Sequence, residues 1–242
     1  MPLQGPYGLR IIENCLTCPV RGDRLFCDLP PDAMRTLASI TSPATYPKGA
    51  LLFVQGQPAR GVFVVCIGRV KLSVSSADGK TVILRVAEAG EVVGLPSTIS
   101  DQPYGVSAEV LEPTQANFIP QDQFLQFLRQ YGEAALRVAQ LLSNIYHTAY
   151  EEIRSLGLSG SSAEKLAKFL LDWSSQHGQQ EQDGEIRLKL PLTHEEIAQM
   201  IGASRETVTR LLAEFKKKQL VRVKGSTLVI RNRAALENLV SS

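Results

Sequence analysis

The sequence predicts an α+β protein with a β-rich N-terminal domain, a long helix and a smaller, helix-rich C-terminal domain. Its 242 residues exceed the usual size of a single domain. Runs of β-prone residues separated by glycine fill residues 46–119, and from about Gln121 the apolar spacing changes from two to three or four. Hydrophobic residues make up 44% and charged residues 21%, which excludes a disordered, collagen-like or coiled-coil-only chain.

The N-terminal domain is predicted to be all-β. We expect strands over residues 51–54, 62–67, 70–74 and 82–84, because each run has strand length and is rich in apolar, mostly β-branched residues. Asp78-Gly79 lies between the last two runs and is a strong hairpin signal, since a tight two-residue turn needs positive φ. Many short strands at regular spacing predict a sandwich or barrel.

Residues 121–157 predict a long helix with a narrow apolar seam. The seam consists of Leu128, Tyr131, Ala135, Val138, Leu142, Ile145 and Ala149. Alternating steps of three and four are typical of a helix that pairs with another helix, whereas a helix on a sheet has a broader apolar face. The helix could pack against its own β domain or pair with a second copy of the chain. The length of the seam favours a dimerisation helix.

A cluster of breakers follows this helix, namely Gly157, Gly160, Ser161 and Ser162, and it is a candidate hinge. Beyond it we expect a helix over 163–175, a polar surface loop over 177–184, and a strand over 186–190 that alternates as an edge strand does. The predicted organisation is a cysteine-containing segment (1–30), a β domain (31–120), the dimerisation helix (121–157) and a C-terminal module (158–242).

Two short helices joined by a tight turn are predicted within the C-terminal module. Thr193-His194-Glu195-Glu196 is a capping box, which starts a helix at about His194. Gly202 ends that helix and Ser204 caps the next one. Two helices joined by a glycine-containing turn form a helix-turn-helix, in which the first residues of the second helix face base edges in the major groove.

The second helix carries side chains suited to DNA. Arginine can donate twice to guanine, and glutamate can accept from cytosine N4. Residues 204–233 hold nine basic and two acidic side chains, whereas residues 1–159 hold 13 basic and 14 acidic ones. Two β-prone runs, 221–224 and 227–230, predict a basic hairpin, the wing of a winged helix. We predict DNA contacts from Thr193, Ser204, Arg205, Glu206, Thr207, Thr209, Arg210 and Lys217. An ordinary amphipathic surface helix is the alternative.

The order of these features closely resembles the Crp/Fnr family of bacterial transcription regulators. The resemblance rests on the stretch Ser204-Arg205-Glu206-Thr207-Val208-Thr209-Arg210-Leu211, preceded by Ile197-Ala198 and Ile201-Gly202, and on the glycine pattern of residues 68–72 and 90–94. It implies that the β domain is a double-stranded β-helix, a jelly-roll-like β-roll that senses a signal. It also implies a homodimer on a palindromic promoter site in double-stranded DNA, with RNA polymerase as a partner.

The resemblance also assigns base-reading positions. Arg205, Glu206 and Arg210 fall on the three family positions that read bases. Because arginine rather than an apolar residue stands at position 205, we expect a TGTGA-like half-site, as in the Crp branch, over the TTGAT type of the Fnr branch.

The family's cyclic-AMP branch holds the nucleotide through a glutamate after the Gly-Glu-x-x-Gly segment and through an Arg-Ser pair about ten residues on. Here Leu95-Pro96 follow Gly94, and no basic residue occurs between Glu88 and Pro120. A buried phosphate needs an ionic partner, so cyclic AMP is disfavoured as the effector. A cyclic-nucleotide-binding module that serves a non-DNA partner is a further alternative.

The cysteines suggest another kind of sensor. Cys15, Cys18 and Cys27 precede the β domain, where the oxygen-sensing Fnr branch places three thiolates of a [4Fe–4S] cluster. The spacing to Cys27 is longer than in that branch, and its fourth cysteine aligns with Asn117. An iron–sulfur cluster or zinc, reversible thiol oxidation and a structural role all stay open, and no ligands are assigned. Cys66 lies within a predicted strand, where a buried structural thiol is expected.

Other classes of protein find little support. His147, His177 and His194 fall on the long helix, a polar loop and the capping box, which does not suggest a metal site. No catalytic triad, carboxylate pair or phosphate-binding loop stands out, so we do not expect an enzyme. No apolar run approaches the ~20 residues of a membrane span, and the first residues do not resemble a signal peptide. We expect a cytoplasmic protein without a membrane partner.

Overall fold

The computed structural model describes residues 5–9, 11–12, 15–18, 22, 25–157, 160–181 and 185–240, with only the backbone for residue 17 and residues 151–157. The chain divides into two compact units, Met1–Ala149 and Tyr150–Ser242, which are described separately below. Within the described residues, no helix has both the length and the apolar composition needed to cross a membrane.

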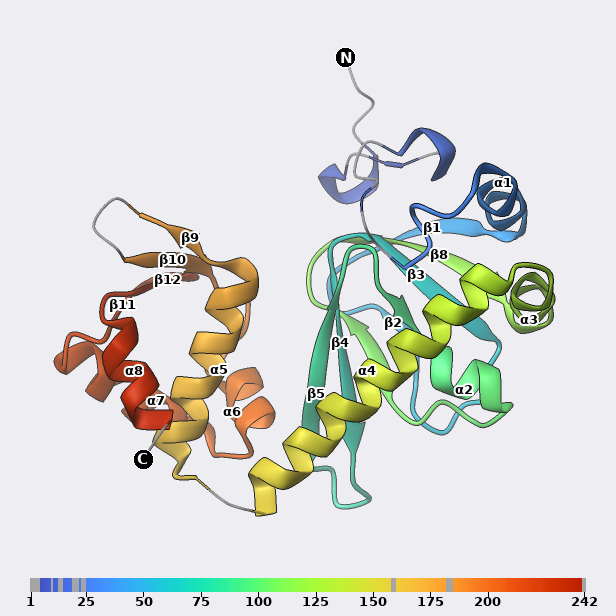
Figure 1. The fold of residues 1–242 in the computed structure, drawn as a ribbon. Coiled ribbons are helices and arrows are strands. Elements are labelled where there is room, and N and C mark those ends of the chain that lie inside the picture. The colour runs from blue at the N-terminus through green and yellow to red at the C-terminus, as the bar shows by residue number, and fades with distance from the viewer. Residues whose placement is uncertain are drawn as a thin grey trace. The chain divides into compact units, whose positions relative to one another are not determined.

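The first unit contains two antiparallel four-stranded sheets (Figure 1). One sheet has the order β1-β8-β3-β6 and the other the order β2-β7-β4-β5. The bounds are β1 Ser42–Tyr46, β2 Leu51–Phe53, β3 Gly61–Ile67, β4 Arg69–Ser75, β5 Thr81–Glu88, β6 Val92–Val93, β7 Ser107–Val110 and β8 Thr114–Pro120. The predicted strands are all present, and β4 and β5 form the expected hairpin, with Gly79 at φ 82°. Residues 76–80 connect the two strands, so the turn is longer than the two-residue turn that Asp78-Gly79 suggested.

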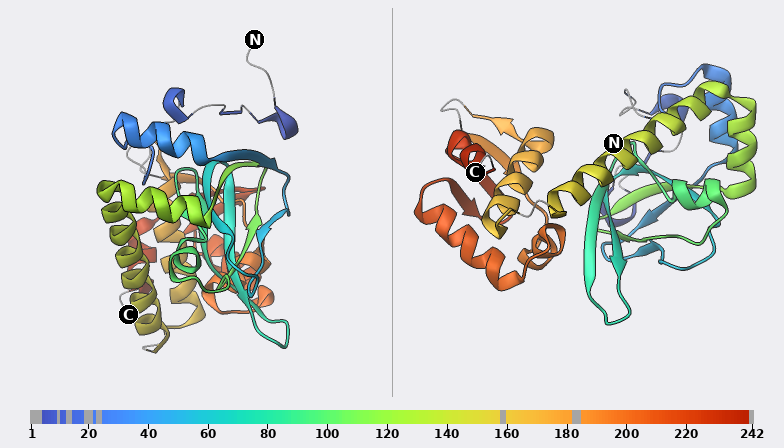
Figure 2. Two further views of the ribbon diagram at one scale, coloured as in Figure 1. Left: turned by 90° about the vertical axis from the view of Figure 1, so that its right-hand side faces the viewer. Right: turned by 60° about the horizontal axis from the view of Figure 1, so that its bottom comes forward.

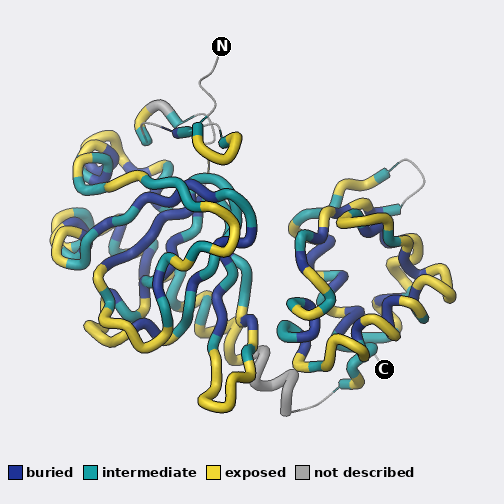
Figure 3. Tube along the Cα trace, turned by 180° about the vertical axis from the view of Figure 1, so that it is seen from behind, coloured by how far each residue is buried: buried dark blue, intermediate teal, exposed yellow. Residues whose placement is uncertain are grey.

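Strand β3 is buried on both faces, which explains its continuous apolar sequence. Phe63 and Val65 join the core between the two sheets, whereas Val62 and Val64 face a second core. Helices cover that second core: α1 (Pro31–Ile40), α2 (Leu95–Ser100), α3 (Gln121–Gln130) and the start of α4 (Gly132–Gly157). Helices α1 and α3 contact each other, and α3 lies against β3 and β8 (Figure 2). Figure 3 shows the buried residues following the strands.

The prediction of one unbroken helix over 121–157 is wrong. Helix α3 ends at Gln130, Tyr131 has φ −119° and ψ 92°, and α4 begins at Gly132. The first part of the seam serves the β domain, because Val138 is buried in its core and Leu128 and Tyr131 pack against that core. Local packing was therefore the right alternative for this part. Farther along the seam, Ile145 is partly buried and Ala149 is exposed, and Tyr146, which lies beside the seam, is 66% exposed.

The second unit places helices against a four-stranded sheet of order β11-β12-β10-β9. Its elements are α5 Ser162–His177, β9 Gln179–Gln180, β10 Ile186–Lys189, α6 His194–Ile201, α7 Arg205–Lys217, β11 Val221–Lys224, β12 Thr227–Ile230 and α8 Arg233–Val240. The predicted helix 163–175 is present and slightly longer, with Ser161 as its N-cap. Residues 158–159 of the predicted hinge lie outside the described residues.

Two expectations about the sheet of the second unit are wrong. The polar stretch 177–184 was expected to be a loop, yet Gln179–Gln180 forms strand β9. Strand β10 was expected at an edge, but Ile186 and Arg187 pair with β9 on one side and with β12 on the other. Strand β9 is held in the sheet by its backbone pairing with β10 alone. Its two exposed glutamines therefore give no strand pattern in the sequence. The predicted alternation of β10 is confirmed, with Ile186 and Leu188 buried.

Candidate DNA interface and cysteine pocket

Helix α6 begins with the predicted capping box. The Glu196 backbone N–H donates to Thr193 Oγ1 over 3.2 Å, and the Thr193 backbone N–H donates to Glu196 Oε2 over 2.8 Å. These two bonds satisfy donors that the first turn of a helix leaves without partners. Gly202 ends the helix with φ 64°, in the left-handed region that favours glycine. The local sequence thus sets both ends of α6.

Helix α7 has one buried face and one polar face. Its N-cap is Ser204, whose Oγ accepts from the Thr207 backbone N–H over 3.2 Å. The apolar residues predicted for its inner face are all buried, namely Val208, Leu211, Leu212 and Phe215. The residues predicted to read bases, Arg205, Glu206 and Arg210, are exposed on the other face. The sequence therefore yields two helices joined by a three-residue turn, with the polar face of the second one open.

A contact that the sequence did not predict joins α6 to α7. The Thr209 hydroxyl donates to the Arg205 carbonyl over 2.9 Å and lies 2.9 Å from His194 Nδ1. This hydroxyl, which we expected to contact phosphate, already has partners in the helix pair. His194 therefore helps to set the position of α7 relative to α6, beyond the place in the capping box that the sequence suggested.

The charges on α7 are arranged for contacts outside the helix. A hydrogen bond from its own backbone N–H lowers the pKa of Glu206, with smaller contributions from the Ser204 hydroxyl and Arg205. Glu206 is thus a carboxylate that can accept from a cytosine amino group. Arg210 forms an ion pair with Glu214 one turn along, with a 2.7 Å distance between Nη1 and Oε1. Because an exposed ion pair of this kind contributes little free energy, Arg210 can leave Glu214 and bind a base edge at a small cost in free energy.

The wing hairpin extends the positive surface. Strands β11 and β12 pair from Val221↔Ile230 to Lys224↔Thr227, and Gly225 turns between them at φ 60°. A cleft of about 340 Å³ on this sheet is lined by Arg187, Arg222, Lys224, Thr227 and Val229. Arg187 was missed by the sequence analysis, although the alternation of β10 places it on the outer face. Lys217 ends α7 and is exposed, as a phosphate contact requires.

The interior of the β domain is filled with side chains. Tyr104 is 3% exposed and stacks on Phe53 with ring centroids 3.9 Å apart. Its hydroxyl donates to the Gly61 carbonyl over 2.7 Å. Helix α2 follows Gly94, and its Thr98 hydroxyl donates to the same carbonyl over 2.8 Å. Among the described residues no charged residue is buried as a whole. Arg69 Nη1 is buried without a hydrogen-bond partner among them, but the same guanidinium already forms ion pairs with Glu88 and Glu112.

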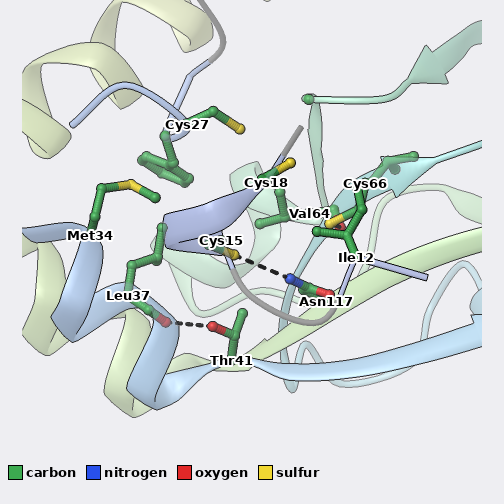
Figure 4. A pocket seen from close by; sticks show the side chains of 13 residues that line it. Ile12, Cys15, Cys18, Cys27, Met34, Leu37, Thr41, Val64, Cys66 and Asn117 are labelled. Carbon is green, nitrogen blue, oxygen red and sulfur yellow. Dashed lines mark hydrogen bonds between the residues drawn. The ribbon is translucent and has the colours of Figure 1, made fainter. Parts of the chain in front are cut away.

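A second cavity, of about 40 Å³, lies at the N-terminal face of the β domain and brings the cysteines together. Cys15, Cys18, Cys27, Cys66 and Asn117 all line it (Figure 4). The expectation that Cys66 is a buried structural thiol is corrected, because Cys66 is only partly buried and shares this cavity. Within the described part of the chain, no three His, Cys, Asp or Glu side chains are placed to hold one metal ion.

The electrostatics of the Cys15 thiol disfavour a simple oxidation sensor. Burial raises the pKa of Cys15, the nearby Cys18 raises it further, and a hydrogen bond from Asn117 lowers it. The thiolate is the form that reacts with oxidants, and low-pKa exposed thiols are the usual redox sensors. A cysteine whose pKa is raised by burial is poorly suited to that chemistry without a further group that stabilises its anion.

The two domains together define the class of protein. A β-sandwich domain precedes a winged helix-turn-helix, which is the arrangement of a transcription regulator that carries a second domain beside its DNA-binding domain. A family model described as the Crp-like helix-turn-helix domain matches residues 164–239, and one described as the cyclic nucleotide-binding domain matches residues 43–131. The chain belongs to the Crp/Fnr family of transcription regulators.

Curated relatives and solved structures agree with this assignment. The chain is 27% identical over 206 residues to the CRP-like cAMP-activated global transcriptional regulator of Mycobacterium tuberculosis, covering 85% of this chain and 91% of that protein. It is 28% identical over 192 residues to the fumarate and nitrate reduction regulatory protein of Vibrio cholerae, covering 79% and 76%. These relatives are transcription regulators and not enzymes.

Solved structures show the same fold. A CooA mutant from Carboxydothermus hydrogenoformans matches with a TM-score of 0.72 at 25% identity, over 84% of this chain and 88% of that one. FixK2 from Bradyrhizobium japonicum matches with a TM-score of 0.75 at 22% identity, over 84% and 98%. The predicted double-stranded β-helix and winged helix-turn-helix are thus confirmed as the fold.

Proposed function

We propose that this regulator binds a palindromic TGTGA-like promoter site as a homodimer, and that Arg205, Glu206 and Arg210 read the bases. The observation that carries the proposal is the exposed polar face of α7, which the caps of α6 and α7 hold at the end of a helix-turn-helix. Ser204, Thr207 and Lys217 would support phosphate contacts through helix N-termini, hydroxyls and charge. The hydroxyls of Thr193 and Thr209 already donate to Glu196 and to the Arg205 carbonyl, so each would have to exchange that bond for one to a phosphate.

A gel-shift titration tests this proposal. The chain is titrated on a TGTGA palindrome, a TTGAT palindrome and random DNA, with half-site centres one helical turn (~34 Å) apart. We expect the tightest binding to the TGTGA site, because an arginine at position 205 can donate twice to guanine. A preference for TTGAT, or none over random DNA, would contradict the assignment of bases.

The homodimer is proposed from the exposed part of α4. Leu136, Tyr146 and Tyr150 are 59%, 66% and 60% exposed, and their spacing places them within one face of the helix. Large apolar side chains gathered on one exposed helix face are typical of an interface. A second copy of α4 is the partner that a palindromic site requires, because the symmetry of the operator mirrors that of the protein.

A charge on that face is expected to separate the protomers. Tyr146→Glu would bury an unpaired carboxylate in the interface and raise the dimer dissociation constant by about 100-fold or more. Thr148→Glu is the matched control, because Thr148 is exposed on the opposite face of α4. Analytical ultracentrifugation measures both masses. A Tyr146→Glu protein that remains dimeric at the concentrations where the wild type does would remove α4 from the interface.

We further propose that DNA binding does not depend on cyclic AMP. The supporting observation is the aromatic core of Phe53, Phe63 and Tyr104, which occupies the interior between the sheets. In calorimetry with cyclic AMP at about 1 mM we expect no heat of binding, and the affinity for DNA should change by less than about twofold. Binding of the nucleotide with a gain of about tenfold or more in DNA affinity would show that this core opens.

The remaining partners follow from the same proposal. A regulator of this type would contact RNA polymerase at its promoter, and a chromosomal DNA site would place it in the cytoplasm. The alternative of a nucleotide-binding module with a non-DNA partner is less well supported, because the chain carries a helix-turn-helix of the Crp type. A sensor built on the cysteines is the remaining candidate for the signal.

A further inference from the structure

The Thr209 hydroxyl has two partners inside the helix-turn-helix. Its Oγ1 lies 2.9 Å from the carbonyl oxygen of Arg205, one turn back along α7, and 2.9 Å from Nδ1 of His194, the first residue of α6. Because a carbonyl oxygen can only accept, the single hydroxyl proton lies in the bond to Arg205. His194 Nδ1 must then carry a proton and donate it to Thr209 Oγ1. The hydroxyl thus uses its proton within α7 and a lone pair toward α6.

These two bonds fix the rotamer of the Thr209 side chain. A threonine in a helix divides between two rotamers, because its hydroxyl can bond a carbonyl one turn back. His194 adds a second bond to the same rotamer, and this bond comes from another helix. With the hydroxyl turned toward Arg205 and His194, the methyl group occupies the other branch at Cβ. Thr209 is exposed, so the methyl is the part of its side chain that remains open to a ligand.

Thr209 lies within the polar face of α7. Arg205 and Glu206 precede it by four and three residues, and Arg210 follows it directly. Residues three and four apart lie on one face of a helix, so Thr209 shares a face with Arg205 and Glu206. All four side chains are exposed. A base edge that meets Arg205 or Glu206 would therefore lie beside the Thr209 methyl group.

The chemistry of the major groove offers one apolar group to such a methyl. Among the base edges, thymine presents its 5-methyl group there, and threonine methyls are among the side-chain groups that contact it. A phosphate contact would instead need the hydroxyl proton of Thr209, which is already donated to the Arg205 carbonyl. The engaged hydroxyl therefore favours a base over a phosphate at this position.

We propose that Thr209 is a further base-reading residue, whose methyl group contacts the methyl group of a thymine in the half-site, and that His194 is the positioning residue that holds it. The inference rests on the proposed binding of DNA by α7. It adds a contact that Arg205, Glu206 and Arg210 do not supply, because these side chains read hydrogen-bonding groups. Thr209 then belongs to base reading and not to the phosphate contacts that the sequence suggested for it.

Replacement of thymine by deoxyuridine tests the contact, because uracil keeps the hydrogen-bonding groups of thymine and lacks only its methyl group. Each thymine of one half-site of the TGTGA palindrome is replaced in turn, on either strand, and Kd is measured by fluorescence anisotropy with the full-length chain. We expect one position at which uracil raises Kd by about three- to fivefold, as the loss of one buried methyl contact should. Uracil outside the half-sites is the control and should leave Kd unchanged.

Two variants separate the methyl group from the hydroxyl. Thr209→Ser keeps the hydroxyl and removes the methyl group, so it should bind the thymine site and the uracil site equally. Thr209→Val is its matched counterpart, because it keeps a methyl group and removes the hydroxyl, and it should still prefer thymine. An effect of uracil on the DNA alone would persist in Thr209→Ser. A Thr209→Ser protein that still prefers thymine would therefore overturn the contact.

Variants of His194 test its positioning role. His194→Ala removes the donor to Thr209 and should bring the ratio of the two Kd values, uracil site over thymine site, closer to one. His194→Asn keeps an N–H donor on a short side chain and should restore this ratio. A role of His194 in folding alone would weaken binding to both sites alike. An unchanged ratio in His194→Ala would thus overturn the positioning role.

The outcomes distinguish this inference from the proposed function. If the wild-type chain bound the TGTGA palindrome no better than random DNA, both would be overturned. If it preferred the palindrome but uracil changed Kd at no position of the half-site, the proposed function would stand and the thymine contact alone would be overturned.

Discussion

Arg205→Ala is expected to weaken binding to the TGTGA palindrome by about 1–3 kcal/mol, roughly five- to 150-fold in Kd, and to relax the choice of base at one position of each half-site. Arg205 is the first residue of α7 and is exposed, so its guanidinium is free of any core role. The loss would come from the two hydrogen bonds that arginine donates to guanine. Fluorescence anisotropy on TGTGA sites with single-base changes measures both effects.

Lys217→Ala is the matched control for this variant. Lys217 ends the same helix and is exposed, but its position fits a phosphate rather than a base. It should weaken binding to every sequence similarly. It should also reduce the slope of log Kd against the logarithm of the salt concentration by about one. Equal losses on specific and random DNA for Arg205→Ala would remove Arg205 from base reading.

Phe124→Ala is expected to lower the free energy of unfolding by about 3–5 kcal/mol, because it leaves a cavity in a fully packed core. Phe124 is 0% exposed and its ring lies 6.0 Å from that of Phe26 in an edge-on contact. The contact joins α3 to the segment that carries the cysteines, so this segment should also lose its packing. Urea unfolding measured by circular dichroism gives the change.

Val82→Ala is the control for the stability measurement. Val82 lies on β5 and is 43% exposed, so its truncation should change the unfolding free energy by no more than about 0.5 kcal/mol. If Phe124→Ala and Val82→Ala unfolded at the same urea concentration, the core formed by α3 and the N-terminal segment would contribute little to stability.

The helix-turn-helix could be predicted from the sequence because its signals are local. Thr193 and Glu196 form both bonds of the capping box, Gly202 adopts the left-handed conformation, and Ser204 caps α7. Each of these signals involves residues no more than a few positions apart. The hairpin at Gly79 could be predicted for the same reason.

The errors arose where distant residues decide the structure. The apolar spacing in the sequence continues across the break between α3 and α4, because Leu128 and Tyr131, which precede α4, pack against the same core as Val138 within it. The spacing alone therefore did not reveal the break. Strand β9 exists only through its pairing with Ile186 and Arg187. Gly132 was a weak local sign of the break.

The cysteine pocket could be predicted from the sequence only in part. The alternation of Val62 and Val64 along β3 could have shown that these two share a face, but the register shift between Val65 and Ile67 falls at Cys66, so alternation does not place that thiol. Nothing local in the sequence showed that the N-terminal segment packs on that face. Its position depends on Phe26, which contacts Phe124 nearly one hundred residues away.

Selection of binding sites from a fully randomised duplex library tests the central claim most directly, because it assumes no site in advance. The full-length wild-type chain is used, and bound duplexes are sequenced after several rounds. The account predicts a two-fold symmetric consensus with TGTGA-like half-sites one helical turn apart. A consensus of the TTGAT type, a single unpaired half-site, or no enrichment over the starting library would contradict it.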